Sequence, residues 1–313
     1  MFLICGEALF DFFAQPDVDD SAARVAFEAV AGGSPFNVAV GLARLERDAA
    51  LLTGMSTDFL GQRLCKVLEH EGVDTRYLVR LDDATTLAMV ALSPSGSPQY
   101  AFYHQHGADR ALTLRHLPEL TDDVSAIHVG SYSLVVSPTA ETLGALIEKE
   151  GAERLVSLDP NVRLKIEPDL DRWREQIGYF ALRADLIKVS EEDLISLYDD
   201  PDGEQVVRRW LAARTSLVLV TRGERGVSVF TREERYTLGT QPVEVVDAVG
   251  AGDTFQAAML CWLDEQGKAN REGVAGLERS EIERMVAFAN AAAGITCTRR
   301  GPDLPRRAEL AAS

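Results

Sequence analysis

The stretch VEVVDAVGAGDTFQAAML, residues 243–260, decides the fold because its hydrophobic pattern changes at a glycine-rich bend. An apolar, β-branched run ends at Asp247, and helical periodicity begins after Gly250, Ala251 and Gly252. These small residues let a ligand approach the backbone, and the first amides of a helix carry partial positive charge. The stretch therefore predicts a strand-to-helix turn that holds an anion without a lysine.

Asp253 directly follows this bend, and two interpretations are open. As a helix N-cap it would contribute about 1 kcal/mol. As a base it would take the proton of a hydroxyl that attacks a phosphorus, and an ordinary carboxyl pKa near 4 would make it a weak one. Phe255 excludes a dinucleotide fingerprint, and no GK[ST] tripeptide supplies a Walker A loop. The turn alone favours the cap.

Short apolar runs alternate with amphipathic stretches along the chain, which predicts a mostly parallel sheet with helices on both faces. The expected strands are 2–5, 49–54, 126–130, 154–159, 186–190, 217–221 and 226–230. The expected helices are 34–46, 58–72, 137–150, 204–214, 252–267 and 280–297. Ligands of such folds bind beyond the carboxyl ends of the strands, where Asp159, Ser190, Thr221 and Asp247 would lie.

Two segments break the alternation, residues 11–30 and 85–105. The second reads as two strands around a turn rich in Pro, Ser and Gly, which is typical of a hairpin. Together the two segments predict a small antiparallel sheet outside the main one.

Charge and cysteine usage narrow the function classes. A net charge of −17 over 313 residues opposes binding to nucleic acid but leaves ATP possible, because local dipoles and a divalent cation can oppose the global field. The four cysteines form no CxxC pair, which is typical of reduced, mostly buried thiols in a cytoplasmic protein. The N-terminal run lacks a basic leader, and no run reaches the roughly 20 apolar residues of a membrane helix. We expect a cytoplasmic protein without a membrane partner.

The segment AGGSPFNVAVGLARL, residues 31–45, suits contact with a polyol. Gly32 and Gly33 permit close approach, and Asn37 in the first helical turn offers donors and an acceptor to vicinal hydroxyls. Asp11, an acid among aromatic residues, must find a partner or face a cleft. The alternatives are that residues 31–45 are an ordinary helix entry and that Asp11 is a solvated acid on an edge strand.

Three further segments carry polar residues after predicted strands: DPNVR (159–163), KVSEEDL (188–194) and TRGERGV (221–227). Arg163 suits bidentate contact with phosphate, and Gly223 and Gly226 leave room for a nucleotide. Ser190 and Asp193 suit Mg²⁺ held through water. Three charged residues of these segments are equally well explained as solvated loop residues: Asp159, Lys188 and Arg222.

Taken in order, GG-x-P-x-N, DPN-x-R, K-V-S-x-E, T-R-G-x-x-G and D-x-x-GAGD resemble the ribokinase-like (PfkB) carbohydrate kinases from about residue 2 to residue 305. The segments GGSPFNVAVGLARL, FYHQHGAD and DPNVR look most like bacterial fructokinases. The resemblance implies a Rossmann-like α/β core and a β-sheet lid that often clasps a partner subunit. It assigns 1–10, 31–84 and 106–313 to the core and 11–30 and 85–105 to the lid, with a homodimer formed through the lid.

The resemblance also implies transfer of the ATP γ-phosphoryl group to a hydroxyl of a ketohexose, fructose first, with Asp253 as base and the amides at 250–252 holding the developing charge. It places the remaining roles as follows: Asp11, Gly32, Gly33, Asn37 and Tyr103 or a neighbour on the sugar; Arg163 on the transferred phosphate; Lys188, Thr221, Gly223, Gly226 and Asn290 on the nucleotide; Asp193 near Mg²⁺ through water; and carbonyls of Asp247, Val249 and the 298–302 loop around K⁺.

Several positions depart from the family pattern or keep alternatives open. Ala248 replaces a usual Thr, and Asp193 is shorter than the usual Glu. The lid run has no Arg, which favours a neutral sugar over 2-keto-3-deoxygluconate, although Arg110 lies nearby. His104 and His106 share a strand face without a third metal ligand. A non-catalytic sugar or nucleotide sensor is opposed by the intact base, anion loop and Arg163.

Overall fold

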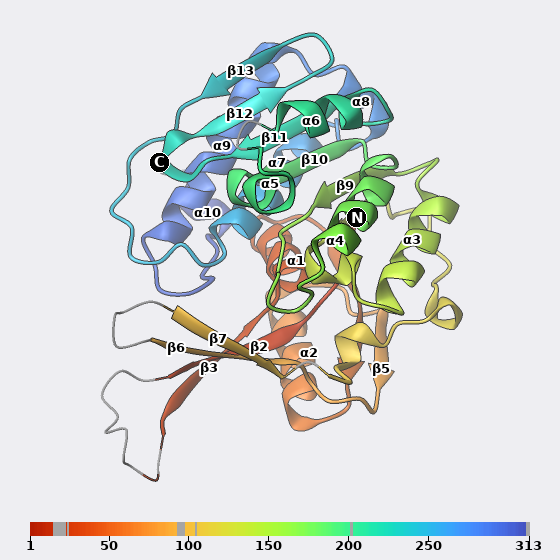
Figure 1. Ribbon diagram of the computed structural model, residues 1–313, viewed down its shortest axis with the longest axis vertical. Helices are drawn as coiled ribbons and strands as arrows, with labels where there is room; N and C mark the ends of the chain where they lie inside the picture. Colours follow the sequence, from red (N-terminus) through yellow and green to blue (C-terminus); the bar gives the residue numbers. More distant parts are fainter. Residues whose placement is uncertain (15–22, 24, 93–97, 104, 201–202, 311–313) are drawn as a thin grey trace.

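The computed structural model of the chain describes residues 1–14, 23, 25–92, 98–103, 105–200 and 203–310. It contains a large sheet covered by helices on both faces and a small sheet that projects from the core (Figure 1). The large sheet has nine strands, in the order β13-β12-β11-β10-β9-β8-β1-β4-β5. Its strands are parallel from β11 to β5, and β12 and β13 add an antiparallel edge.

The strands of the large sheet are β1 (Phe2–Cys5), β4 (Ala49–Ser56), β5 (Leu78–Leu81), β8 (Ala126–Gly130), β9 (Leu155–Asp159), β10 (Leu186–Ser190), β11 (Leu217–Thr221), β12 (Val227–Phe230) and β13 (Arg235–Leu238). The α-helices are α1 (Ser34–Arg44), α2 (Phe59–Glu71), α3 (Thr139–Glu150), α4 (Leu170–Ala181), α5 (Glu191–Tyr198), α6 (Glu204–Leu211), α7 (Ala251–Glu265), α8 (Arg271–Ala275), α9 (Arg279–Cys297) and α10 (Arg307–Leu310). The seven strands and six helices expected from the alternation therefore appear with ends within three residues of the expected ones.

The central strands read as continuous apolar runs because both faces of the sheet are covered. Successive side chains of a strand point to opposite faces, so Phe2 and Ile4 of β1 join one core cluster while Leu3 and Cys5 join the other. The first cluster packs under α1, α7 and α9, and the second packs under α3, α4 and α6. Cys5 and Cys261 are buried, as expected, and all four cysteines are free thiols.

The predicted strand before the glycine-rich bend is wrong. Residues 243–246 form an extended loop without a strand partner, and Val246 is 63% exposed. The amides of Val246 and Asp247 instead donate to the carbonyl of Cys297 at the end of α9. The β-branched run looks like a strand locally, but the sheet already ends at β13 and offers it no place. The bend is thus a loop-to-helix turn.

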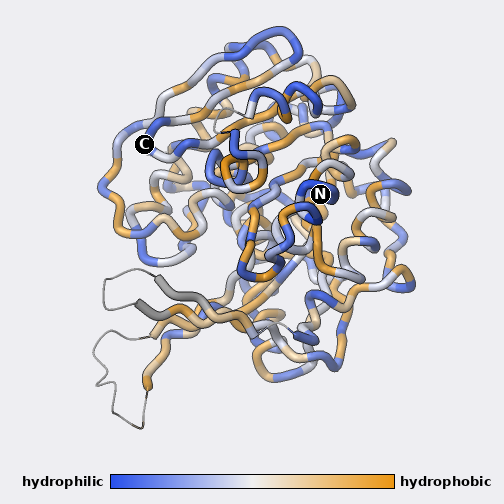
Figure 2. Tube along the Cα trace, viewed as in Figure 1, coloured by the Kyte–Doolittle hydropathy of each residue, from blue (hydrophilic) through white to orange (hydrophobic). Residues whose placement is uncertain are grey.

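The small sheet has the order β3-β2-β6-β7 and comprises β2 (Leu9–Ala14), β3 (Phe27–Gly32), β6 (Leu87–Leu92) and β7 (Pro98–Tyr103). We call it the lid. It was expected to be antiparallel, but β2 pairs with β6 in parallel, because both strands leave the core in the same direction. Figure 2 shows largely apolar residues along β2 and β3, outside the main core.

The described helices include none with the length and apolar character needed to cross a bilayer.

Candidate active site

A cavity of about 950 Å³ lies where the lid meets the carboxyl ends of the core strands. Its walls come from β2 and β7 of the lid, the start of α1, the 161–166 loop, β10 with α5, the 221–225 loop and the start of α7. Segments far apart in the sequence therefore contribute to one hollow, as expected for an α/β fold of this type.

Helix α7 begins at the glycine-rich bend without any side-chain cap. Its N-cap is Gly250, whose φ of 80° lies in the left-handed region, and a Cβ there would meet Pro302 at 2.7 Å. Only glycine fits this position without strain. The helix therefore presents its first turn, with its partial positive charge, to the cavity.

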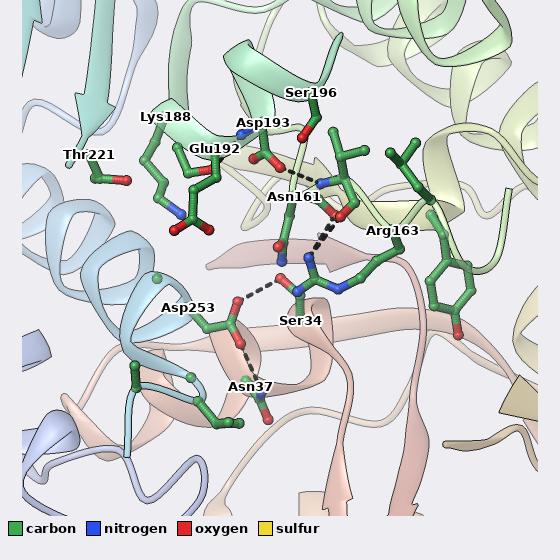
Figure 3. Close-up of a pocket in the computed structure, with 18 of the residues that line it drawn as sticks. Ser34, Asn37, Asn161, Arg163, Lys188, Glu192, Asp193, Ser196, Thr221 and Asp253 are labelled. Carbon is green, nitrogen blue, oxygen red and sulfur yellow. Dashed lines mark hydrogen bonds between the residues drawn. The ribbon is translucent and has the colours of Figure 1, made fainter. Parts of the chain in front are cut away.

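Asp253 is not the cap of this helix, so the interpretation favoured by the turn alone is wrong. It is the third residue of α7, and its carboxylate turns toward α1. The Ser34 hydroxyl donates to Asp253 Oδ1 at 2.6 Å, and the Asn37 amide donates to Oδ2 at 2.8 Å (Figure 3). The side chain lines the cavity although the residue is only 7% exposed.

Burial raises the pKa of Asp253 above the ordinary carboxyl range. Hydrogen bonds from Ser34 and Asn37 and the nearby Lys188 charge lower that pKa in part. The expectation of an unperturbed weak base is therefore wrong, because the group is desolvated. A raised pKa brings a carboxylate closer to the range in which general bases work best.

Asn37 has a different contact from the one expected. Its amide nitrogen, predicted to meet sugar hydroxyls, is bound to Asp253. Gly33, at φ 106°, closes onto the backbone of Glu7, and a Cβ there would lie 2.8 Å from the Glu7 carbonyl oxygen. The start of α1 therefore holds the carboxylate of Asp253 in place as well as lining the cavity.

The lid side of the cavity carries Asp11, Leu9 and Phe102. Gly32 does not line the cavity but makes room for Asp11, since a Cβ there would lie 2.6 Å from the Asp11 carboxylate. Tyr103 is 66% exposed and points away, while its neighbour Phe102 faces the cavity, because successive residues of a strand face opposite sides.

Carboxylates dominate this end of the cavity. Burial raises the pKa of Asp11 to about 6, opposed by the positive charge of Arg163. Burial also raises the pKa of Glu7 to about 7, opposed by hydrogen bonds from Ser131 and Ser133. Glu7 accepts the Ser34 backbone N–H at 3.3 Å and the Ser133 hydroxyl at 2.7 Å, so it anchors the start of α1.

Basic residues also line the cavity. Arg163 lines the cavity, as expected, and its guanidinium donates to the carbonyl of Val162 at 3.0 Å. Lys188 forms a buried ion pair with Asp159 at 2.7 Å. The alternative that Asp159 and Lys188 are solvated loop charges is therefore wrong. The expectation of an anion hole without a lysine is wrong as well, since a Cβ on Gly252 would lie 3.0 Å from Lys188 Nζ.

The expected nucleotide residues divide into two groups. Thr221 and Gly223 line the cavity, together with Arg222 and Arg225, and Arg225 pairs with Glu191. Besides Gly32 and Tyr103, four expected site residues lie outside the cavity lining: Gly226, Asp247, Ala251 and Asn290. Gly226 supports the turn into β12 at φ 84°, and Asn290 on α9 donates to the carbonyl of Gly239 at 3.4 Å.

The residues predicted near Mg²⁺ and K⁺ have hydrogen-bond partners within the protein. Asp193 Oδ1 accepts the Val162 N–H at 3.0 Å, and burial raises the pKa of Asp193. Asp247 accepts the N–H groups of Val249 at 3.0 Å and Gly301 at 2.9 Å, so it joins the 247–249 and 298–302 loops. Among the described residues, no three His, Cys, Asp or Glu side chains converge as metal ligands, while His104 lies outside the described residues.

Several lining residues were missed from the sequence: Glu7, Ser34, Tyr132, Asn161 and Glu192. Ser34 and Asn161 lie inside motifs already singled out, GGSPFN and DPNVR, so the sequence held a signal for both residues. In the structure Asn161 has a positive φ of 39°. Glu7 and Tyr132 had no such signal in the sequence, because their place at the cavity depends on how β1 and β8 pair.

Comparison with known proteins agrees with this geometry. The sequence model of the pfkB family carbohydrate kinases matches residues 2–308. A fructokinase of Rhizobium leguminosarum bv. trifolii is 36% identical over 307 residues, which cover 98% of this chain and 88% of that protein.

Among solved structures, fructokinase with bound ATP from Xylella fastidiosa has a TM-score of 0.89 and 28% identity, covering 99% of this chain and 97% of that one. A fructokinase double mutant from Vibrio cholerae O395, in its fructose, ADP and potassium ion bound form, has a TM-score of 0.84 and 26% identity, covering 99% and 97%. With its ribokinase-like α/β core, lid and cavity, the chain belongs to the pfkB family of carbohydrate kinases.

Proposed function

We propose that this kinase transfers the γ-phosphoryl group of ATP to a hydroxyl of a neutral ketohexose, with fructose as the first candidate. The observation that carries the proposal is the placement of Asp253. Its carboxylate is held by α1, lies at the start of α7 and faces one cavity, which Asp11 lines from the lid and Arg163 and Lys188 line from the core. The relatives and solved structures named above, which are fructokinases, support the same choice of sugar.

At the lid end, Asp11 accepts hydrogen bonds from sugar hydroxyls, and Phe102 and Leu9 cover the apolar face of the ring. Glu7 and Asp11 line this end, and the charge of Arg163 already acts on Asp11, so little positive charge remains for the carboxylate of a sugar acid. Arg110, the residue that left 2-keto-3-deoxygluconate open, is absent from the described lining of the cavity. A neutral sugar therefore fits this end better than an acid.

In the reaction, the sugar hydroxyl oxygen forms a bond to the γ-phosphorus as the bond from that phosphorus to the β–γ bridging oxygen breaks. The hydroxyl proton moves to Asp253, and ADP is the leaving group. Arg163 and the amides at the start of α7 offset the charge on the transferred group. Asn37 and Ser34 keep the Asp253 carboxylate aimed during this step.

Mg²⁺ bound to ATP supplies charge neutralisation for the phosphates. The described residues fit an ion held mainly by phosphate oxygens and water. Helix α5 brings the carboxylates of Glu191, Glu192 and Asp193 to the cavity, and the described residues form no all-protein metal cluster. Asp247 joins the 247–249 loop to the 298–302 loop, and both loops offer backbone carbonyls for K⁺.

The lid is also proposed to clasp a second copy of the chain. The exposed apolar side chains of Phe27 and Tyr103 in the lid, and of Val25 just before β3, favour such an interface over contact with water. Sedimentation velocity at micromolar concentration should then give a dimer, and Phe27→Asp should shift it toward monomer. A wild-type monomer at that concentration would contradict this part of the proposal.

The activity is tested by a coupled ADP assay with fructose, other ketohexoses, aldohexoses, ribose, nucleosides and 2-keto-3-deoxygluconate. We expect the largest kcat/KM for fructose. Preference for the sugar acid would refute the substrate while leaving kinase activity in place. A sugar-dependent rise in Tm without ADP release would indicate a sensor instead.

A further inference from the structure

Helix α1 ends at Arg44, and the guanidinium of this residue joins three segments of the chain. Its Nε and Nη2 groups donate to the two carboxylate oxygens of Glu71 on α2, at 3.0 and 2.7 Å. Its Nη1 group donates to Asp303 Oδ1 at 2.9 Å and to the Leu304 carbonyl at 2.7 Å. Arg44 is outside the described cavity lining, so its effect on a reaction there is indirect.

The fork from Arg44 to Glu71 fixes the guanidinium in space. The two side chains are 17% and 8% exposed, and Arg306 donates a further hydrogen bond to Glu71 at 3.1 Å. Two parallel hydrogen bonds to one carboxylate set the plane of a guanidinium as well as its position. The remaining Nη1 group is therefore aimed, and it can hold a third segment in place.

That third segment is residues 301–304, which we call the C-terminal strap. Its Leu304 is buried, and a Cβ on Gly41 of α1 would lie 2.6 Å from Leu304 Cδ2. The same Cβ would lie 2.8 Å from the Cβ of Ala257 on α7. The strap, α1 and α7 thus meet at one point that has no room for a further methyl group.

The other end of the strap contacts the glycine-rich bend before α7. A Cβ on Gly250 would lie 2.7 Å from Pro302 Cβ, and the Gly301 N–H donates to Asp247 Oδ2 at 2.9 Å. The ring of Pro302 leaves the backbone little freedom to yield. A displacement of the strap therefore changes the position of the bend and of the first amides of α7.

Helix α1 is in this way connected to α7 at both of its ends. At its start, Ser34 and Asn37 hold the carboxylate of Asp253. At its end, Arg44 holds the strap that contacts the bend. The two ends are about 15 Å apart, at 1.5 Å per residue. One helix therefore sets the position of both the proposed base and the amides that face the transferred group.

Stability alone does not explain the contact with the strap. Asp303 is 53% exposed, and ion pairs with an exposed partner contribute little because water screens them and ordering the side chains costs entropy. The pair with Glu71 alone would join α1 to α2. What Nη1 adds is a fixed distance between the end of α1 and the strap.

We propose that Arg44 is a positioning residue for phosphoryl transfer, which acts through the C-terminal strap to hold the Gly250 bend against the transferred group. This rests on the proposed kinase function. Arg44 touches neither substrate, and the proton and the phosphoryl group move as described above. A misplacement of about 1 Å at a reacting centre can lower the rate about 10²-fold, so a small displacement of the bend is measurable.

The test compares Arg44→Met with the matched control Arg47→Met. Arg47 lies just after α1 and pairs at 3.2 Å with Asp264, near the end of α7. We expect Arg44→Met to lower kcat about 10- to 100-fold. The KM for sugar and the affinity for ADP, measured by calorimetry, should change less than about 3-fold, because ADP lacks the transferred group. Arg47→Met should keep the wild-type kcat.

Hydrogen exchange followed by mass spectrometry gives a second readout that does not need catalysis. Peptides that cover residues 247–252 should exchange at least about 3-fold faster in Arg44→Met than in the wild type, because the bend opens more often. Their exchange should be unchanged in Arg47→Met. A residue that only stabilised the C-terminal segment would change the exchange of residues 298–310 alone.

Asp303→Asn serves if Arg44→Met fails to fold, since it weakens the strap side of the contact and leaves the pair with Glu71 intact. We expect a smaller loss of kcat, about 3- to 10-fold, because the Leu304 carbonyl remains as an acceptor. In a folded Arg44→Met background the same substitution should add no further loss, because both act through one contact.

A kcat of Arg44→Met within about 3-fold of the wild type, or faster exchange confined to residues 298–310, would overturn the role given to Arg44. If only Asp303→Asn folds, a wild-type kcat in that variant would overturn it. A wild-type protein that releases no ADP with any sugar would refute the kinase function itself. The exchange of residues 247–252 would still decide whether Arg44 holds the bend, so the two failures are distinguishable.

Discussion

Replacing Ser34 by alanine tests how the proposed base is tuned. The Ser34 hydroxyl donates to Asp253 Oδ1 at 2.6 Å in a buried setting and lowers the pKa of Asp253 against the effect of burial. A hydrogen bond to a charged group contributes about 1.5–3 kcal/mol. Its loss should therefore raise the proton affinity of Asp253 about 10- to 150-fold, since 1.36 kcal/mol corresponds to tenfold.

The sign follows from which form the hydroxyl stabilises. Ser34 stabilises the carboxylate, so Ser34→Ala raises the pKa of Asp253, and the base is protonated at higher pH. The acidic limb of kcat against pH should move to higher pH, while kcat on the alkaline side of that limb stays near the wild-type value. The assay is ADP release with saturating fructose and ATP across the pH range of folding.

The matched control is Ser228→Ala, which removes a fully buried hydroxyl that contacts Thr237 at 3.3 Å away from the cavity. Its acidic limb should coincide with that of the wild type. The charges of Asp11 and Lys188 are common to all three proteins and cancel in the comparison. An unmoved limb in Ser34→Ala, or an equal loss of kcat at every pH, would refute the reasoning.

Three further predictions follow from the same site. Asp253→Asn should lower kcat about 10²- to 10⁴-fold with little change in sugar KM, and near-normal turnover would remove the base assignment. Gly250→Ala should lower the free energy of unfolding, measured in urea, by more than about 1–2 kcal/mol, because an alanine at φ 80° is strained and also meets Pro302; an unchanged midpoint would contradict this. Burial raises the pKa of Glu7 from 4.5 to about 7, so the contribution of Glu7 to stability is present at low pH and is lost as pH rises through about 7. The Tm of Glu7→Gln should therefore rise relative to that of the wild type between pH 4.5 and 7. Parallel curves of Tm against pH for the two proteins would count against this prediction.

Much of the core could be predicted because buried parallel strands read as apolar runs. The runs at 2–5, 126–130, 186–190 and 217–221 appear as strands with unchanged ends. Their side chains are buried on both faces, so the local pattern and the tertiary environment agree. The run at 243–246 has the same local character but no neighbouring strand, and there the pattern was misleading.

The sequence by itself determined that a helix starts at the glycine-rich bend, because the change of hydrophobic periodicity there is a local property of a short segment. It could not determine what Asp253, Asn37 and Lys188 contact. The partners of Asp253 lie 219 and 216 residues away, and the partner of Lys188 lies 29 residues away on the neighbouring strand. Only the packing of α7 against α1 and of β10 against β9 brings these groups together, and only burial sets the pKa of the proposed base.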